Sequence, residues 1–306
     1  MIVALAGGIG AAKLVLGLAQ VMPQRRLAVV GNTGDDIELF GLRICPDLDT
    51  IAYTLAGQVN PATGWGIGGD TFNCLSGLAH YGCETWFQLG DRDLATHLRR
   101  TQLLREGLTL SEATQRICQA LSVSVRLIPM TNAYTPTYVV TDNAVLHLQE
   151  YLVRERARPV VRAFRYSNMD RATPAPELEE LIMGAEAVVI CPSNPFISIG
   201  PILAVPGIEA LLRRTAAPVI AVSPIVGGRA LKGPAASMLQ QMGRPVSAYG
   251  VAGLYRDLLD TFVLDRQDVS LREDIEALGM KAVVANTVMD TLEDKTRLAR
   301  QLLKLV

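Results

Sequence analysis

The sequence begins with MIVALAGGIGAAKLVLGLAQ (Met1–Gln20), which has the pattern of a buried strand, a glycine turn and a helix. Residues 1–6 are a short apolar run that ends at glycine, as parallel strands buried on both faces do. The helix that follows carries Leu14 and Leu18 on one face, and Gly17 inside it indicates close packing against a neighbour. This order of elements predicts the first unit of an α/β fold.

Three more apolar strands end in loops of similar composition. Leu27–Val30 leads into GNTGDD (31–36), Ala187–Cys191 leads into PSNP, and Val219–Val222 leads into SPIVGG. Ligands of open α/β sheets bind outside the carboxyl ends of the strands. We therefore expect these loops and the first glycine turn to line one crevice.

The middle of the chain has a different pattern of predicted elements. TLSEATQRICQALS (Thr109–Ser122) predicts a helix with a capping box from Thr109 to Glu112. Short strand-like segments follow and predict an antiparallel insertion; they are 125–128, 137–141, 144–150 and 160–164. A strand at 282–285 and a helix over 291–303 close the chain. The predicted fold class is therefore α/β, a doubly wound, Rossmann-like, mainly parallel sheet in one domain over 1–306, with a smaller inserted α+β subdomain at roughly 109–165.

Composition excludes several classes of protein. The 306 residues are 49% hydrophobic and carry a formal net charge of -1, so the chain should bury a large core and has no basic field to attract nucleic acid. The five cysteines form no CxxC pair, which is typical of reduced thiols in the cytosol. Lys13 interrupts the first apolar run well short of the ~20 residues that span a bilayer. We expect a cytoplasmic protein without a targeting segment or a membrane partner.

The glycine turn is the first candidate binding feature. Gly7, Gly8 and Gly10 lie where a strand meets a helix, and the free N–H groups of a helix N-terminus bind phosphate. The spacing is neither GxGxxG nor that of a Walker A loop. Tight packing of the strand against the helix is the alternative explanation.

Four aspartates gather in the next loops. Asp35 and Asp36 follow the second strand, and CPDLDT adds Asp47 and Asp49. Carboxylates beside a phosphate repel it unless a cation intervenes, and hard oxygen ligands suit Mg²⁺. The alternative is a set of solvated turn residues, with Asp49 capping the next helix.

Two loops further along have more than one interpretation. GWGIGGDTF (Gly64–Phe72) has enough glycine to let a backbone lie against a flat ligand, but a mobile loop that ends in a helix cap has the same composition. LGDRDLATHLRR (Leu89–Arg100) places mixed charges at a helix start, which favours an ion-pair network. His97 in this stretch is then structural rather than catalytic.

Polar stretches late in the chain suit a nucleotide. PSNPFISIGP (Pro192–Pro201) and SPIVGGRALKGPA (Ser223–Ala235) combine hydroxyls, an amide, backbone N–H groups and the cations Arg229 and Lys232. Such groups form a cradle for phosphates. Rigid surface turns with solvated charges are the alternative, and neither stretch is a GxSxG nucleophile elbow.

Taken together and in order, the motifs resemble those of a known family. GGIGAAKLVLGL, NTGDD, ICPDLDTIAYTLAG, GWGIGGDTF, LGDRDLATH, CPSNPFISIGPIL and SPIVGGRALKGPA resemble the 2-phospho-L-lactate transferase family of coenzyme F-420 biosynthesis. The resemblance implies transfer of a phosphate-bearing three-carbon acid from lactyl-diphosphoguanosine, or its enolpyruvyl counterpart, to the terminal ribityl hydroxyl of the deazaflavin Fo. GMP would leave, Mg²⁺ would assist, and the protein would be a homodimer.

The resemblance also assigns residues. It makes Asp49 an active-site residue and a neighbour of Fo, with Gln88 and Asp91 as further Fo neighbours. The predicted catalytic residues are Asp49 and Asp36, and the predicted metal ligands are Asp35, Asp36 and Asp49. The residues predicted to bind phosphate or nucleotide are Gly7, Gly8, Gly10, Asn32, Ser193, Asn194, Ser223, Gly227, Gly228 and Lys232.

Two departures from the family pattern stand out. Ile9 replaces the threonine of the family's GGTG turn, and Thr131-Asn132-Ala133 replaces its SDD. Motif spacing does not distinguish lactyl, enolpyruvyl and glyceryl donors, and it identifies no general base.

Two other classes of function compete with the transferase. A non-catalytic regulator that binds nucleotide-sugars would share the glycine turn, but it has no use for an Fo site, so the full PDLDT and LGDRD strings favour the enzyme. An NAD-dependent oxidoreductase is disfavoured because GxGxxG and an acidic residue at the end of the second strand are both missing.

Overall fold

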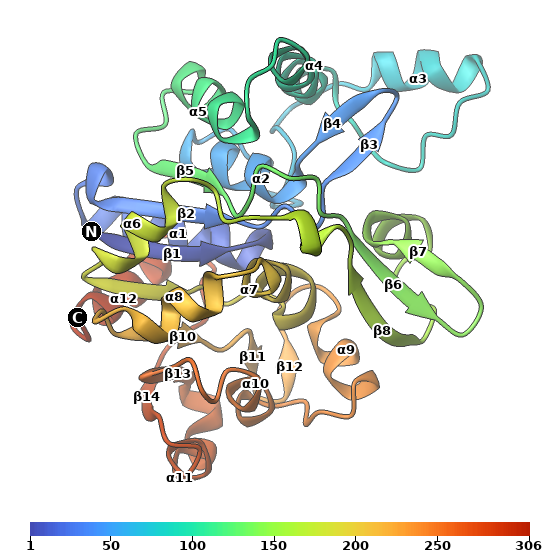
Figure 1. Cartoon of the computed structure of the whole chain (residues 1–306). Coiled ribbons are helices and arrows are strands. Elements are labelled where there is room, and N and C mark those ends of the chain that lie inside the picture. Colours follow the sequence, from blue (N-terminus) through green and yellow to red (C-terminus); the bar gives the residue numbers. More distant parts are fainter.

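A seven-stranded parallel sheet is the centre of the computed structural model, which describes residues 1–306 (Figure 1). The strand order is β14-β13-β10-β9-β1-β2-β5. The strands are β1 (Ile2–Ala6), β2 (Leu27–Gly31), β5 (Arg126–Pro129), β9 (Ala187–Ile190), β10 (Val219–Val222), β13 (Thr261–Asp265) and β14 (Lys281–Ala285). The predicted α/β fold with a mainly parallel sheet is confirmed.

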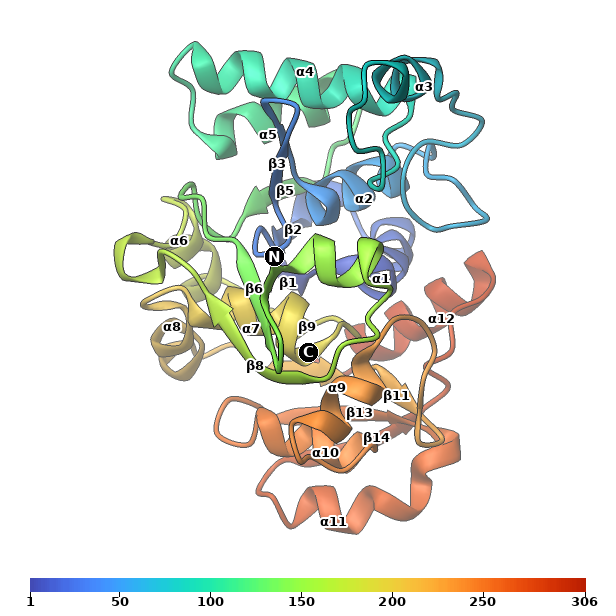
Figure 2. The ribbon, with the colours of Figure 1, turned by 90° about the vertical axis from the view of Figure 1, so that its right-hand side faces the viewer.

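The chain reverses the direction in which it builds the sheet between β1 and β9. From β1 it adds β2 and β5 on one side, then crosses to the other side and adds β9, β10, β13 and β14 in turn. Ile2 pairs with Leu27 of β2 on one side and with Ala187 of β9 on the other. Loops diverge at such a switch point and leave a crevice outside the carboxyl ends of the strands. Figure 2 looks onto this edge.

Helices cover both faces of the sheet because both faces are apolar. Val3 and Leu5 belong to one buried cluster, whereas Ile2 and Ala4 belong to the other, as alternation along a strand requires. The first face is covered by α6 (Leu178–Met183), α7 (Gly200–Ala204), α8 (Ile208–Arg214), α9 (Ala235–Gln241), α10 (Ala248–Leu254) and α11 (Arg272–Glu276). The second is covered by α1 (Gly8–Val21), α2 (Pro46–Leu55), α5 (Leu110–Ala120) and α12 (Leu292–Leu303).

Two segments extend from the central sheet beyond the carboxyl ends of its strands. The first, between β2 and β5, holds β3 (Ile37–Leu39), β4 (Leu42–Ile44), α3 (Asn73–His80) and α4 (Asp91–Arg105). The second is an antiparallel sheet of β6 (Thr137–Thr141), β7 (Val145–His147) and β8 (Val161–Tyr166), with the short helix η2 (Glu150–Arg154). In Figure 1 this sheet lies to the right of β1 and β2. The short elements that remain are η1 (Gln24–Arg26), η3 (Met169–Arg171), η4 (Pro195–Ile199), η5 (Arg266–Leu271), β11 (Ile225–Val226) and β12 (Arg229–Ala230).

Part of the segment predicted as an insertion belongs to the main sheet. Residues 125–128 overlap β5, which pairs in parallel with β2, and α5 packs beside it with the predicted capping box at Thr109 and Glu112. The physical reason is burial: Leu127, Ile128 and Pro129 are consecutive buried residues, whereas β6 alternates buried and half-buried positions.

No single helix is long and apolar enough to cross a membrane. The pair Pro195–Ala204 and Ile208–Arg214, bent by 83°, meets that length and composition only when its two parts are taken together.

Gly17 lets α1 and α12 approach closely, as the sequence indicates. A Cβ on Gly17 would overlap the carbonyl oxygen of Lys295. We predict that Gly17→Ala lowers the free energy of unfolding by about 1–3 kcal/mol, because overpacking outweighs the better helix propensity of alanine. Urea unfolding measures this change.

The matched control is Gly77→Ala in α3, where a Cβ would meet nothing within 4 Å. It should stabilise the protein by up to about 1 kcal/mol. Equal effects of the two substitutions would contradict the packing explanation.

Candidate active site

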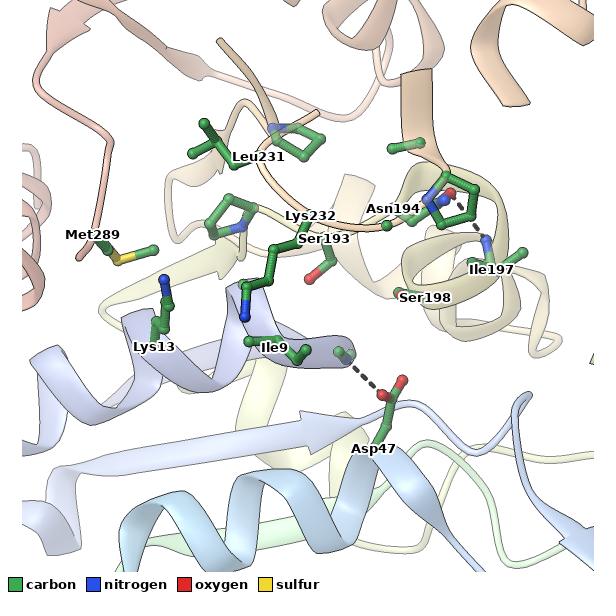
Figure 3. A pocket seen from close by; sticks show the side chains of 18 of the residues that line it. Ile9, Lys13, Asp47, Ser193, Asn194, Ile197, Ser198, Leu231, Lys232 and Met289 are labelled. Carbon is green, nitrogen blue, oxygen red and sulfur yellow. Dashed lines mark hydrogen bonds between the residues drawn. The ribbon is translucent and has the colours of Figure 1, made fainter. Parts of the chain in front are cut away.

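A cavity of about 410 Å³ opens at the carboxyl edge of the sheet (Figure 3). Its walls come from Gly7–Gly10, Asp35, Pro192–Asn194 and Ser223–Pro224, which follow β1, β2, β9 and β10. These are the four loops that were predicted to share one crevice, so that prediction is confirmed. Further walls come from outside these four loops. Leu231–Ala235, Ile197, Ser198 and Asp47 lie in stretches that the sequence analysis had singled out, whereas Lys13, Leu148, Leu152 and Thr287–Asp290 were not predicted as part of the site.

Close packing explains the glycine turn, and its binding of phosphate stays a prediction. A Cβ on Gly10 would overlap the carbonyl oxygen of Pro192, and a Cβ on Gly7 would lie 2.7 Å from Asp47 Oδ2, so packing alone requires glycine at both positions. Gly8 has a φ of +74°, which favours glycine for its backbone conformation. The same turn places the N-terminus of α1, where backbone amides lack partners within the helix, at the cavity, and the Gly8 amide among them bonds to Asp47.

Asp47 accepts a hydrogen bond from this turn. Its Oδ1 lies 2.6 Å from the Gly8 amide nitrogen and its Oδ2 lies 2.9 Å from Asn32 Nδ2. Asn32 is fully buried and also donates to the Ile197 carbonyl, so it positions the carboxylate rather than lining the cavity itself. Burial raises the pKa of Asp47 to about 6, against the opposing effect of these hydrogen bonds.

Asp35 is the other buried carboxylate of the cavity wall. Gln149 Nε2 lies 3.4 Å from its Oδ2, whereas Oδ1 is buried without a partner. Burial, then Asp47 and Asp36, raise the pKa of Asp35 well above its usual range. An orphaned carboxylate oxygen next to a second carboxylate is a chemically suitable donor set for a cation.

These carboxylates fit a magnesium ion only together with other ligands. No group of three His, Cys, Asp or Glu side chains is arranged to hold a metal. Mg²⁺ is commonly held by one or two carboxylates, several waters and substrate phosphates, and Asp35 and Asp47 can supply the protein's share.

Asp36 and Asp49 do not line the cavity. Cys45 Sγ donates to Asp36 Oδ2 at 3.0 Å, and burial raises the pKa of Asp36 to about 7, although Arg43 opposes this. Asp49 is buried in a two-point ion pair with Arg100, whose Nη1 lies 3.0 Å from Asp49 Oδ2. The structure thus separates these two aspartates from Asp35 and Asp47.

The ion pair of Asp49 extends into the network that the LGDRD stretch predicts. His97 Nδ1 lies 3.6 Å from Asp49 Oδ2, and its Nε2 lies 3.3 Å from Asp93 Oδ1. Tyr53 donates its hydroxyl proton to Asp93 at 2.7 Å. These contacts join α2 to α4 in a buried polar layer, so His97 has a structural position here.

The two further Fo candidates lie outside the cavity. Gln88 is exposed and donates to the Thr85 carbonyl. Asp91 accepts from Thr71 Oγ1 at 2.6 Å and from the Cys74 amide at 2.9 Å, and these hydrogen bonds, Thr71 first, lower its pKa to about 2. Their contact with Fo stays a prediction.

The predicted nucleotide residues divide into two groups. Ser193, Asn194, Ser223 and Lys232 line the cavity. The Ser193 hydroxyl is buried without a partner, whereas the Asn194 amide oxygen caps η4 and the Ser223 hydroxyl bonds to the backbone of Ile225.

Gly227 and Gly228 do not line the cavity. They form the turn between β11 and β12, with φ values of +57° and +73°. The Gly227 amide donates to Asp268, which fixes the turn. These glycines therefore have a hairpin position outside the cavity, and their contact with a nucleotide stays a prediction.

The two departures from the family pattern occupy different places. Ile9 lines the cavity and packs against Gly64, where a Cβ would lie 2.8 Å from Ile9 Cγ2. Asn132 instead accepts from the amide and hydroxyl of Ser111 at the start of α5. The 131–133 segment contains no acid and does not line the cavity.

Sequence reasoning missed Lys13 and Asp290, which both line the cavity. The available signal was a single cation in an otherwise apolar helix one turn beyond the glycine turn. Burial lowers the pKa of Lys13, with Asp290 opposing and Lys232 adding to the shift. Asp290 could not be connected to this site because the order of the strands in the sheet, which places the loop after β14 near the cavity, does not follow from the sequence.

The Asp49–Arg100 pair predicts that Asp49→Asn is strongly destabilising. Removing one charge leaves the buried Arg100 guanidinium uncompensated, which costs about 3–5 kcal/mol in the free energy of unfolding. The control Asp142→Asn, in the exposed pair with Arg162, should cost less than about 1 kcal/mol.

Arg100→Met added to Asp49→Asn should recover part of this loss, because neither charge then remains. Chemical denaturation of the wild type, Asp49→Asn, Arg100→Met and the double variant measures the coupling. A loss below 1 kcal/mol for Asp49→Asn would contradict the structural role of the pair.

The raised pKa of Asp36 predicts a pH dependence of stability. The folded pKa of about 7 exceeds the ordinary value of 3.8, so the folded state binds the proton more tightly and this group's contribution to stability falls as pH rises from about 4 to 7. Relative to Asp36→Asn, the wild type should lose stability across that window. A difference between the two proteins that is constant with pH would refute the assignment.

Comparisons with known proteins extend over nearly the whole chain. The family model described as 2-phospho-L-lactate transferase CofD matches residues 2–301. A phosphoenolpyruvate transferase of Streptomyces griseus is 42% identical over 310 residues, covering 99% of this chain and 98% of that protein. A 2-phospho-L-lactate transferase of Methanosarcina mazei is 36% identical over 293 residues, covering 96% of each.

A crystal structure gives independent support for the fold. A UPF0052 family member from Bacillus halodurans has a TM-score of 0.67 at 13% identity, covering 99% of this chain and 98% of that one. At that identity the likeness concerns the fold alone. From the match to its family model and the identity with its relatives, the chain belongs to the 2-phospho-L-lactate transferase family.

Proposed function

We propose that this protein transfers a phospholactyl or phosphoenolpyruvyl group from a lactyl- or enolpyruvyl-diphosphoguanosine donor to the deazaflavin Fo. The products are F-420-0, or its dehydro form, and GMP. Family membership supports the reaction class. The observation that carries the proposal is the cavity at the β1–β9 switch point, where a helix N-terminus, two lysines and a buried hydroxyl face one space.

The cavity suits the diphosphate of such a donor. The amides at the start of α1 and the positive end of its dipole favour an anion, and the ammonium groups of Lys13 and Lys232 add positive charge. Apolar walls from Leu148, Leu152 and Met289 leave room for the uncharged parts of the ligand.

The transfer needs positioning and charge neutralisation. The terminal hydroxyl oxygen of Fo forms a bond to the phosphorus that carries the three-carbon acid, and the phosphoanhydride bond to the GMP phosphate breaks. The bridging oxygen leaves on GMP with the bonding electron pair, and the hydroxyl proton passes to solvent. The α1 amides and the lysines stabilise the charge on the phosphate oxygens.

Mg²⁺ is proposed as the cofactor. Asp35 and Asp47 would hold it against the diphosphate, where it would neutralise phosphate charge. Asp36 and Asp49 do not line the cavity. They would then act indirectly, by positioning the loops that carry Asp35 and Asp47. We extend the proposal, from the family resemblance, to a cytoplasmic homodimer with Fo near Asp49, Gln88 and Asp91.

The test is GMP release from an enolpyruvyl- or lactyl-diphosphoguanosine donor in the presence of Fo and Mg²⁺. Wild-type protein should release one GMP for each F-420-0 or dehydro-F-420-0 formed, and chelation of Mg²⁺ should abolish the reaction. Asp47→Asn should reduce kcat/KM by about two orders of magnitude or more, since it removes a charge at the reacting phosphates.

The control is Asp142→Asn on the exposed β6–β7 turn, which should leave the rate unchanged. Binding of a nucleotide-sugar without any turnover of either donor would contradict the transferase proposal.

A further inference from the structure

Two lysines stand on different walls of the cavity. Lys13 belongs to α1, in the turn of helix that follows the glycines, and Lys232 belongs to the segment after β12. Figure 3 shows both side chains at the same space, with Ser193 and Ile9 beside Lys232. The two cations come from parts of the chain more than 200 residues apart, and the fold brings them together.

Neither lysine forms an ion pair with a carboxylate of the protein. Every ion pair in the structure uses an arginine, a histidine or the amino terminus, and none uses a lysine. Lys232 has one long hydrogen bond, 3.4 Å to the Thr63 carbonyl oxygen. Asp290 and Asp294 act on Lys13 from a distance and favour its charged form, whereas Lys232 and Lys295 oppose it. Two adjacent cations in a half-enclosed site are unfavourable without an anion between them.

A third group at the same place lacks a partner. The Ser193 residue is 5% exposed, its Oγ has no hydrogen-bond partner, and it lines the cavity beside the N-terminus of α1. Buried hydroxyls are nearly always paired, so an orphaned one inside a binding cavity indicates a ligand atom. The hydroxyl can donate to the same anion that the lysines attract.

We infer that Lys13 binds the diphosphate of the donor and that it forms, with Lys232 and the Ser193 hydroxyl, a clamp around that group. The nature of the ligand rests on the proposed function. Lys13 is the fixed half of the clamp, because α1 is held against α12 at Gly17 and against Pro192 at Gly10. Lys232 is the adjustable half, since it is exposed and is followed by Gly233, which has a φ of +71° and open space around it.

The experiment measures binding of guanosine diphosphate (GDP), GMP and guanosine to the full chain by calorimetry, without Fo. Lys13→Met keeps the length of the side chain and removes its charge. It should weaken GDP binding about tenfold to a hundredfold, as loss of a charge-assisted hydrogen bond does, and should leave guanosine binding unchanged. Lys13→Arg should restore most of the affinity for GDP.

Lys295→Met is the matched control. It removes the same charge from the neighbouring α12, close enough to affect Lys13, but Lys295 does not line the cavity. It should leave GDP binding unchanged within about twofold. Lys232→Met should weaken GDP binding as Lys13→Met does, and thermal unfolding of each variant identifies any that fails to fold.

The outcomes separate this inference from the proposed function. GDP binding that depends on Lys13, in a protein that transfers nothing to Fo, would support the clamp and overturn the transferase. Normal transfer by Lys13→Met with an unchanged KM for the donor would overturn the clamp and leave the transferase standing. Equal loss of GDP and guanosine affinity in Lys13→Met would also overturn it, because a general distortion of the cavity does not discriminate by charge.

Discussion

The close approach of the β1–α1 turn to the loop after β9 is the constraint on which the rest of the structure depends. These two loops lie on either side of the switch point, and a side chain on Gly10 would overlap the backbone of Pro192. Because they can approach so closely, the start of α1 and the Ser193 hydroxyl share one cavity. The same turn places the Gly8 amide within hydrogen-bond distance of Asp47, which brings α2 to the edge of the site.

The charged side chains of this site form two sets, one that lines the cavity and one that is buried behind it. Lys13 and Lys232 face the cavity without forming an ion pair, although Asp290 lies near Lys13, and Asp35 and Asp47 belong to the cavity wall with raised pKa values. Behind them, Asp49 and Arg100 neutralise each other in the layer between α2 and α4. A site whose lysines and carboxylates form no ion pair with one another suits a ligand that is itself an anion with a bound cation.

Much of the fold could be predicted from the sequence because the strands are continuous apolar runs that end in glycine or small polar residues. The convergence of the first four loops followed from their places at strand ends. The position of β5 could not, since a four-residue strand at a sheet edge looks the same whether it pairs with β2 or with an antiparallel neighbour. The sequence motif does not distinguish the roles of Asp47 and Asp49, because both lie in the first turn of α2. Only the packing of that helix directs Asp47 to the Gly8 amide and Asp49 to Arg100. Lys13 was missed because its meaning depends on Lys232, far away in the chain.

The most direct test of the account is a crystal structure of the protein with GDP and Mg²⁺. The account predicts that the diphosphate lies at the N-terminus of α1, between Lys13 and Lys232, with the metal ion held by Asp35 or Asp47. A diphosphate bound elsewhere, for example beside Gln88 and Asp91 or against Asp49, would contradict it.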